Sequence, residues 1–489
     1  MNTMANLNVI YKIVLFSLIV LIIPLFASCQ YIAAKFYSQG IELSENGYYE
    51  EAIFEFSKAI EFDPDSSEAY NERGYAYELN ENYDKALADY TMAIQLAPQS
   101  AYAYINRAHV LEHNMRYEDA LEDAKKAVEL DPNNEEAFNA CGYIYDSMGY
   151  LDEAIADYTR AIEIYPYYAE AYNNRGYAYE GKGDFEKAID DYTKAIEQDP
   201  EYSIAYSNRG YVFYSIGDYE KAIEDYNKAI ELDPYDAIYY CDRGDIYDSM
   251  GDYQKAIEDY NKSLDLEPND AFTYNNRGCT YDSLGDYEKA LEDFNKAIEL
   301  DPDYILAYNN RGCAYDSLGY QEKAIENYNE CMQLDPDFAS AYNNRGYTYY
   351  CQENWAHALA DYNKAIELDA EYTIAYVNRA YLYEYTGLYE EAISDANTAI
   401  ELEPDNEETY NVRGYIYDSM DELDKALEDL HKAIELNSLY ADAYNNLAYV
   451  YERMGEIDKA ISNLEMYIAL EEESSTTSAE EWLQELKSR

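Results

Sequence analysis

Residues 169–202 read AEAYNNRGYAYEGKGDFEKAIDDYTKAIEQDPEY. This stretch contains two apolar stripes whose residues recur four and three positions apart, the spacing of one face of an α-helix. The stripes are Tyr172, Gly176 and Tyr179, then Ala188, Tyr192 and Ala195. A turn around Gly183 separates them, and Pro200 ends the second because proline cannot continue a helix. The stretch therefore predicts an antiparallel helical hairpin.

The same pattern recurs along the chain with a period of 34 residues. Counted from Ala33, thirteen windows reach Ser474 without insertion or deletion, and each has an aromatic residue at position 4 and alanine at position 20. Position 8 is always glycine or alanine, and ten of the eleven prolines lie at position 32. Such regularity predicts a solenoid of stacked hairpins, because one hairpin is too small to bury its own apolar face.

This pattern resembles the tetratricopeptide repeat (TPR) family over residues 33–474. The resemblance implies an all-α fold, a right-handed α-solenoid (superhelix) of about thirteen 34-residue helix-turn-helix repeats. Residues 475–489 are expected to form a C-terminal capping helix over the last repeat. Its expected capping box is Ser478 with Glu481, and its expected apolar stripe is Trp482, Leu483 and Leu486.

Position 7 departs from the family, in which it is usually leucine. It is arginine in ten repeats, and most of these carry aspartate at position 23, as Arg175 and Asp191 do. We expect an ion pair between the two helices of each such hairpin, with the arginine stem packed and its guanidinium group satisfied.

The first helix of each repeat has a second stripe, at positions 2, 5, 9 and 12 with positions 6 and 13 beside it. In the family, this side lines a concave groove that carries ligand contacts. Position 6 is asparagine in eight repeats: Asn106, Asn174, Asn208, Asn276, Asn310, Asn344, Asn378 and Asn446. Position 9 is often tyrosine and position 12 often acidic, as in Tyr143, Tyr177, Tyr211, Tyr347, Glu78, Asp146, Asp248, Asp282 and Asp316.

These residue types suit an extended, basic protein segment or peptide. An asparagine amide both donates and accepts hydrogen bonds, so a row of them can hold a peptide backbone of any sequence. The row resembles the asparagine ladder of O-linked N-acetylglucosamine transferases, although no transferase domain follows here. Tyrosine adds flat contact area, and carboxylates favour lysine or arginine in the ligand. Alternatively, duplication of the repeat copied these residues without a ligand selecting them.

The formal net charge is −64, from 99 acidic and 35 basic residues. This charge repels nucleic acid and favours basic partners, and no basic stripe exists to follow phosphates. We therefore expect a protein or peptide partner and no nucleic acid.

Residues 1–29 differ from the repeats. Lys12 precedes an apolar run from Ile13 to Phe26, which is short for a membrane span but suits a signal-peptide core. Small residues before Cys29 resemble the lipobox of bacterial lipoproteins, in which the cysteine is acylated. This resemblance implies a protein attached to a membrane of the bacterial cell envelope, outside the cytoplasm. An uncleaved membrane anchor and ordinary secretion remain alternatives.

Two other functions compete with peptide binding. A structural spacer or assembly lipoprotein would use its convex face instead of the groove. His109, Glu112 and His113 spell the H-x-x-E-H pattern of inverted zinc peptidases, but Glu112 is also the usual position-12 acid. The sequence has no nucleophile elbow, Walker loop or dinucleotide fingerprint. We therefore expect a non-catalytic protein without a metal or cofactor.

Overall fold

The computed structural model describes residues 29–471 and 477–488, and every regular element within these ranges is a helix. Residues 29–45 form the first helix described. The others are α2 (Tyr49–Phe62), α3 (Ser67–Leu79), α4 (Tyr83–Leu96), α5 (Ala101–His113), α6 (Tyr117–Leu130), α7 (Glu135–Ser147), α8 (Leu151–Ile164), α9 (Ala169–Gly181), α10 (Phe185–Gln198), α11 (Ser203–Ser215), α12 (Tyr219–Leu232), α13 (Ala237–Ser249), α14 (Tyr253–Leu266), α15 (Ala271–Ser283), α16 (Tyr287–Leu300), α17 (Ile305–Ser317), α18 (Gln321–Leu334), α19 (Ala339–Cys351), α20 (Trp355–Leu368), α21 (Thr373–Tyr385), α22 (Tyr389–Leu402), α23 (Glu407–Ser419), α24 (Leu423–Leu436), α25 (Ala441–Arg453), α26 (Ile457–Leu470) and α27 (Thr477–Ser488).

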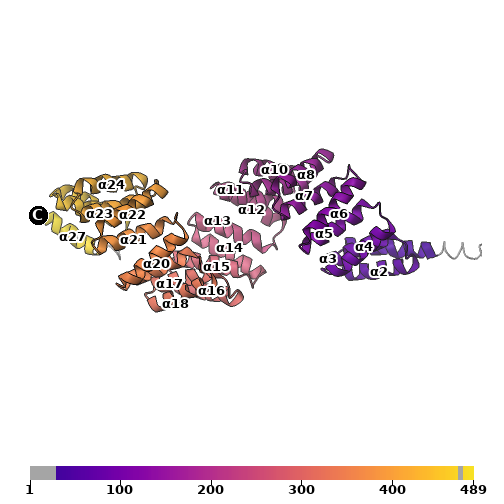
Figure 1. Ribbon diagram of the computed structural model, residues 1–489, viewed down its shortest axis with the longest axis horizontal. Coiled ribbons are helices and arrows are strands. Elements are labelled where there is room, and N and C mark those ends of the chain that lie inside the picture. Colours follow the sequence, from indigo (N-terminus) through magenta and orange to yellow (C-terminus); the bar gives the residue numbers. More distant parts are fainter. Residues whose placement is uncertain (1–28, 472–476, 489) are drawn as a thin grey trace, which may run out of the picture. The chain divides into compact units, whose positions relative to one another are not determined.

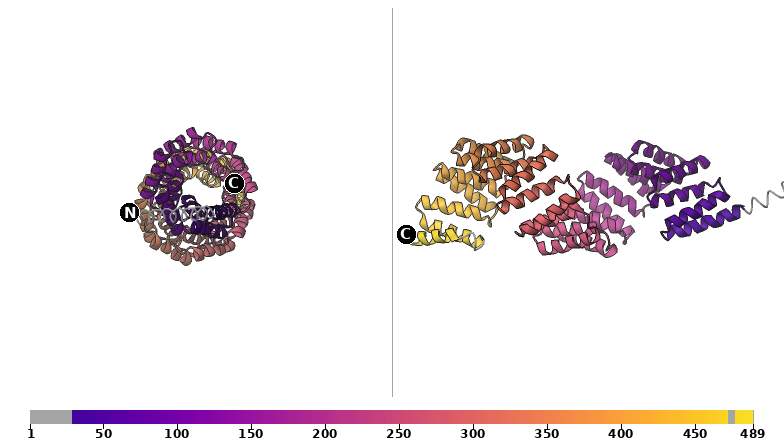
Figure 2. Two further views of the ribbon diagram at one scale, coloured as in Figure 1. Left: turned by 90° about the vertical axis from the view of Figure 1, so that its right-hand side faces the viewer. Right: turned by 90° about the horizontal axis from the view of Figure 1, so that it is seen from below.

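The helices form consecutive antiparallel hairpins, so the predicted all-α solenoid is confirmed (Figure 1). From α3 to α26, each first helix occupies positions 1–13 of its window and each second helix positions 17–30. The chain divides into two compact units, with the boundary between Ile246 and Tyr247 in α13. Within each unit, hairpins lie side by side along the chain (Figure 2).

Small residues let the two helices of a hairpin approach closely. In α9 and α10, Gly176 packs against the ring of Tyr192, which has no exposed surface. Ala188 is also fully buried. Each second helix therefore fixes an aromatic or aliphatic side chain against the small position-8 residue of the first helix.

The turn inside each hairpin requires a left-handed backbone at position 15. Nine repeats have glycine there, such as Gly183 with φ of 74°. The remaining four have Glu81, Met115, Glu353 and Asp421, with φ between 57° and 63°. Glycine adopts this conformation without steric cost, whereas other residues do not.

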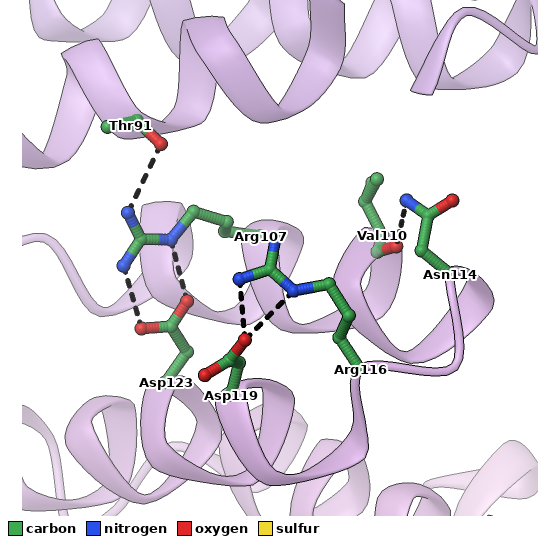
Figure 3. A network of polar contacts seen from close by, with 7 residues as sticks. All are labelled: Thr91, Arg107, Val110, Asn114, Arg116, Asp119 and Asp123. Atoms are coloured by element: carbon green, nitrogen blue, oxygen red, sulfur yellow. Dashed lines mark hydrogen bonds and ion pairs between the residues drawn. The ribbon is translucent and has the colours of Figure 1, made fainter. Parts of the chain in front are cut away.

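Arginines at position 7 hold adjacent hairpins together, and the predicted Arg–Asp pairs are confirmed in eight repeats. Arg107 donates to both carboxylate oxygens of Asp123 in its own repeat, over 2.7 and 2.8 Å. It also donates to Thr91 of the preceding repeat at 3.2 Å (Figure 3). The guanidinium group therefore joins three helices, a role that the position-7 and position-23 pattern does not predict.

The C-terminal helix α27 packs on the last repeat as expected. Leu486 is buried, and Trp482 and Leu483 pack in the same apolar cluster. Trp482 stacks on Tyr449 and donates its indole N–H to Glu452 at 2.9 Å. The capping-box prediction is wrong, because α27 begins at Thr477 and Ser478 therefore lies inside the first turn.

Among the residues that the structure describes, no helix combines the length and apolar character needed to cross a lipid bilayer. The predicted signal-peptide core lies outside these residues, whereas Cys29 is the first residue described and is helical.

Candidate functional site

The first helices of the repeats lie on the inner side of each unit. First helices of consecutive repeats, such as α5 and α7 or α21 and α23, approach within 8 Å between Cα atoms. No pair of second helices does so within the described residues. The stack therefore curves toward the first helices, as in solenoids with a concave binding surface.

The predicted tyrosines present their rings on this inner side. Tyr143, Tyr177, Tyr211 and Tyr347 are 44%, 55%, 49% and 50% exposed, respectively. Tyr143, Tyr177 and Tyr211 supply one ring per repeat in the consecutive repeats 4, 5 and 6, and we call these three rings the tyrosine wall. Large aromatic side chains at this level of exposure are available for contact with a partner.

The asparagines are half-buried and join neighbouring repeats. In seven cases, the side-chain amide donates to asparagine at position 5 of the preceding repeat, as Asn174 does to Asn139 at 3.3 Å and Asn208 to Asn173 at 3.0 Å. The other bonds run from Asn106 to Asn71, Asn310 to Asn275, Asn344 to Asn309, Asn378 to Asn343 and Asn446 to Asn411. In the eighth case, Asn276 accepts from Asn275 at 3.3 Å.

An asparagine side chain has two donors and two acceptor lone pairs, so one such bond leaves the amide able to bind a second group. The position-6 asparagines therefore hold neighbouring first helices together in addition to their predicted contact with a bound peptide. The position-5 asparagines were not predicted as site residues, although the sequence shows the recurrent Asn-Asn pair, as at 173–174.

Most of the predicted carboxylates have internal partners. Glu78 accepts from the hydroxyl group of Tyr90 at 2.6 Å, and Asp316 accepts from Tyr328 at 2.9 Å. Asp248 accepts from Thr280 in the next repeat at 2.6 Å. These acids therefore connect the first helix to a buried tyrosine or threonine, and only the remaining lone pairs of each carboxylate are available to a ligand.

Asp146 and Asp282 differ from these acids. Asp146 makes no side-chain hydrogen bond or ion pair within the described residues, and burial raises its pKa to about 6. One carboxylate oxygen of Asp282 is buried without a partner, and burial also raises its pKa. In repeat 8, position 24 is Phe294, which has no hydroxyl group to offer.

Repeat 7 carries an acid that was not among the predicted site residues. Asp242 replaces asparagine at position 6 and accepts from the hydroxyl group of Tyr226 at 3.0 Å. Burial raises the pKa of Asp242 to about 7, while the bond from Tyr226 lowers it and the charges of Asp245 and Asp236 raise it further. The sequence signal for this acid was the aspartate in place of asparagine at position 6 of repeat 7.

Two hollows lie on the inner side of the first unit. One, of about 510 Å³, is lined by Tyr37, Tyr75, Glu68, Glu72 and Asn106, among others. Burial raises the pKa of Glu72 in this hollow. The second, of about 540 Å³, lies between α7, α8 and α9 and includes Asp146. Both combine aromatic rings, carboxylates and amides, which suits an extended ligand with positive charge.

The H-x-x-E-H residues have ordinary contacts. Glu112 accepts from Ser147 at 2.7 Å, and the ring of His113 lies 4.0 Å from that of Tyr83 between centroids. His109 is exposed. Across the described parts of the chain, no three His, Cys, Asp or Glu residues are grouped so that they could hold a metal ion.

Several family models match the chain, and together they cover well over half of it. Models described as tetratricopeptide repeat match residues 67–100, 101–134, 173–237, 237–270, 271–304, 294–326, 339–372, 374–406 and 441–473. A model described as TPR repeat matches residues 40–81, 142–183, 314–353 and 414–455. A search of curated proteins gives no match.

Solved structures include similar chains. The crystal structure of an APC/C hetero-tetramer, Cut9-Hcn1, contains a chain 16% identical, with a TM-score of 0.48 and coverage of 93% of this chain and 96% of that one. A tetratricopeptide repeat protein from Parabacteroides merdae is 21% identical, with a TM-score of 0.44 and coverage of 52% and 99%. MamA is 29% identical, with a TM-score of 0.32 and coverage of 35% and 93%.

Proposed function

Because the chain belongs to the tetratricopeptide repeat family, whose members are protein-interaction scaffolds, we propose that it binds a basic, extended segment of a partner protein along its first helices. Membership of the family supports the general part of the proposal, that the chain is a scaffold that binds proteins. The choice of surface and the positive charge of the partner come from the residues on the inner side of each unit.

One observation carries this proposal: the inner side is aromatic and acidic and has a single lysine or arginine at the positions of the stripe. Positions 2, 5, 6, 9 and 12 contain no lysine or arginine in any of the thirteen windows, and position 13 contains only one, Arg453, which pairs with Asp418 and Asp421. Ten other arginines of the repeats lie at position 7, where aspartate or asparagine side chains accept their hydrogen bonds, as at Arg107 and Arg311. A lysine or arginine of the partner would therefore meet carboxylates that, with few exceptions, have no cation beside them, next to exposed tyrosine rings.

The amide row supports an extended conformation of the bound segment. Seven of the position-6 asparagines keep hydrogen-bonding capacity beyond their bond to the preceding repeat. Peptide N–H and C=O groups can use this capacity without regard to side chains, while the carboxylates select for basic residues. Binding would thus tolerate variation in the partner's sequence and depend on its charge.

We also propose that the protein is a lipoprotein of the bacterial cell envelope, anchored through Cys29. The apolar run from Ile13 to Phe26 and the small residues before the cysteine support this assignment. Mass spectrometry of the mature amino terminus tests it: acylated Cys29 is expected. A mature chain that starts at Met1 would favour the uncleaved anchor, and an unmodified new terminus would favour secretion.

Peptide binding can be tested with the full chain purified in detergent. The probes are fluorescein-labelled 20-residue peptides of alternating lysine and serine, or of glutamate and serine, followed by fluorescence anisotropy. Only the lysine peptide is expected to bind, and its Kd should rise with salt. The proposal fails if neither peptide binds, or if the glutamate peptide binds equally well.

Matched variants locate the binding surface. Tyr177→Ala combined with Tyr211→Ala removes two rings of the tyrosine wall, and about a tenfold increase in Kd is expected. Tyr235→Ala is the control, because Tyr235 is 81% exposed but lies in the turn between α12 and α13. If both variants bind as the wild type does, the inner side is not the binding surface, and the spacer that uses its convex face becomes the better explanation.

A further inference from the structure

The hollow between α7, α8 and α9 has the features of a side-chain pocket. Its volume is about 540 Å³, and Tyr143 and Tyr177 of the tyrosine wall border it. Asp146, Asn174 and Tyr158 line it as well, and no lysine or arginine does. We call it the Asp146 pocket. Its exposed rings lie next to solvent, whereas Tyr158 has no exposed surface.

Tyr158 is an unpartnered polar group on the buried side of this pocket. Its hydroxyl group makes no hydrogen bond. Burial and, secondly, the negative charge of Asp146 raise the pKa of Tyr158, so the hydroxyl group lies near enough to this carboxylate to be affected by its charge. A buried hydroxyl group without a partner destabilises the fold unless water or a ligand satisfies it.

Other repeats satisfy the same pair of positions internally. Position 24 donates to position 12 in the pairs Tyr90–Glu78 at 2.6 Å, Tyr192–Glu180 at 2.8 Å and Tyr328–Asp316 at 2.9 Å. Repeat 4 has both residue types, but neither side chain is bonded within the described part of the chain. The Asp146 pocket therefore differs from its counterparts in holding a carboxylate and a hydroxyl group that both lack a partner.

We propose that the Asp146 pocket receives the ammonium group of a lysine from the bound basic segment, an inference that rests on the proposed function. The ammonium group has three donors, so it can bind Asp146 and the hydroxyl oxygen of Tyr158 together. The four-carbon stem then passes between Tyr143 and Tyr177, whose rings favour both the methylene groups and the charge.

This assignment also accounts for the cost of the buried carboxylate. Burial alone raises the pKa of Asp146, because no cation offsets the lost hydration. A lysine ammonium group would supply the missing charge. Its compact charge suits contact with one carboxylate and one hydroxyl group, whereas the planar guanidinium group of arginine prefers a carboxylate that is open to two parallel bonds.

The test uses the same lysine–serine peptide and full chain, with Asp146→Asn compared with Asp190→Asn. Both variants lose one negative charge, but Asp190 is exposed on the second helix α10 and does not line the pocket. Asp146→Asn is expected to raise the Kd about tenfold, and Asp190→Asn less than about twofold. Equal effects would overturn the pocket while leaving binding along the first helices intact.

Tyr158→Phe supplies a second measurement that does not depend on charge. It should raise the Kd about threefold without lowering the temperature of unfolding, because the hydroxyl group has no partner to lose. Tyr192→Phe is the control and should lower that temperature, since Glu180 would lose its donor. If Tyr158→Phe binds as the wild type does, the ammonium group does not reach the hydroxyl group and the proposal fails.

The choice of lysine is tested with an arginine–serine peptide of the same length. We expect Asp146→Asn to weaken binding of the lysine peptide more than that of the arginine peptide. The reverse order would overturn the ammonium assignment. If neither the lysine peptide nor the arginine peptide binds the wild-type protein, the proposed function itself is refuted.

Discussion

Gly176 lies so close to Tyr192 that a β-carbon at residue 176 would be 2.9 Å from the ring. Gly176→Ala should therefore destabilise the protein by about 1–3 kcal/mol, the usual cost of overpacking a close-packed interior. Urea denaturation followed by circular dichroism measures this loss. An unchanged midpoint would mean that the ring moves aside without cost.

The natural control for this contact lies in repeats 3 and 11. There the small residue is alanine and position 24 is also alanine, in the fully buried pairs Ala108 with Ala124 and Ala380 with Ala396. Gly176→Ala combined with Tyr192→Ala should consequently destabilise less than the sum of the two single variants. A double-mutant cycle with no coupling would contradict a direct contact between the two side chains.

A second prediction concerns the left-handed residue of the hairpin turn. Met115 is 76% exposed and has φ of 58°, so its side chain contributes little packing while its backbone is strained. Met115→Gly should stabilise the protein by about 1 kcal/mol, because glycine removes the steric cost of this conformation.

The reverse change is the control for the turn. Gly183→Ala should destabilise by about 1 kcal/mol, since φ is 74° and a β-carbon there would meet no atom within 4 Å. The effect would thus report backbone strain alone. Stabilisation by Gly183→Ala would refute this explanation of why nine repeats have glycine at position 15.

A third prediction tests the arginine that joins three helices. Arg175 donates to Asp191 over 2.7 and 2.8 Å and to Thr159 of the preceding repeat at 2.9 Å. Arg175→Ala removes both hydrogen bonds of the guanidinium group to the buried carboxylate of Asp191 and leaves only Lys194 at 3.7 Å, so a loss of about 3 kcal/mol is expected. Arg175→Lys should recover only part of it, because lysine cannot reproduce the planar fork.

Arg160→Ala is the matched control for charge. Arg160 pairs with Glu163 on the exposed side of α8, with both side chains about half exposed, so a change below about 0.5 kcal/mol is expected. Comparable losses from both variants in urea denaturation would show that overall charge, and not the buried pair, determines the effect.

The sequence predicted the hairpins and the Arg–Asp pairs because each depends on positions within one period. Arg175 and Asp191 lie 16 residues apart in the same repeat, so their recurrence is visible. The bond from Arg175 to Thr159 crosses to the preceding repeat. Spacing within one repeat does not show which side chains meet across two repeats, because that depends on how consecutive hairpins stack.

The candidate site was harder to predict for the same reason. Asn174 was recognised as a recurrent polar residue on the first helix, but its bond to Asn139 depends on how two repeats stack. The missing bond at Tyr158 was invisible in the sequence, because repeat 4 has the same residue types as repeats that make it. Ser478 was placed wrongly because helix ends are the least certain part of a periodic pattern.

The last prediction concerns stability against pH. The pKa of Asp242 is about 7 in the folded protein, against an ordinary value of 3.8. The folded state therefore binds this proton more tightly than the unfolded state, so its free energy of unfolding rises as the pH falls from about 8 toward 4. Asp242→Asn should stabilise the protein by about 1–2 kcal/mol at pH 8, and this gain should disappear near pH 4.

Urea denaturation at pH 4, 6 and 8 measures this dependence, with Asp190→Asn as the control. Asp190 is exposed on α10, so its variant loses the same charge without relieving burial. Relief of general repulsion in a chain of net charge −64 would stabilise both variants to a similar extent. Only the Asp242→Asn variant should show a gain that is large at pH 8 and absent near pH 4, because its uncharged amide oxygen can still accept from Tyr226. Equal, pH-independent gains would show that burial of Asp242 does not limit stability.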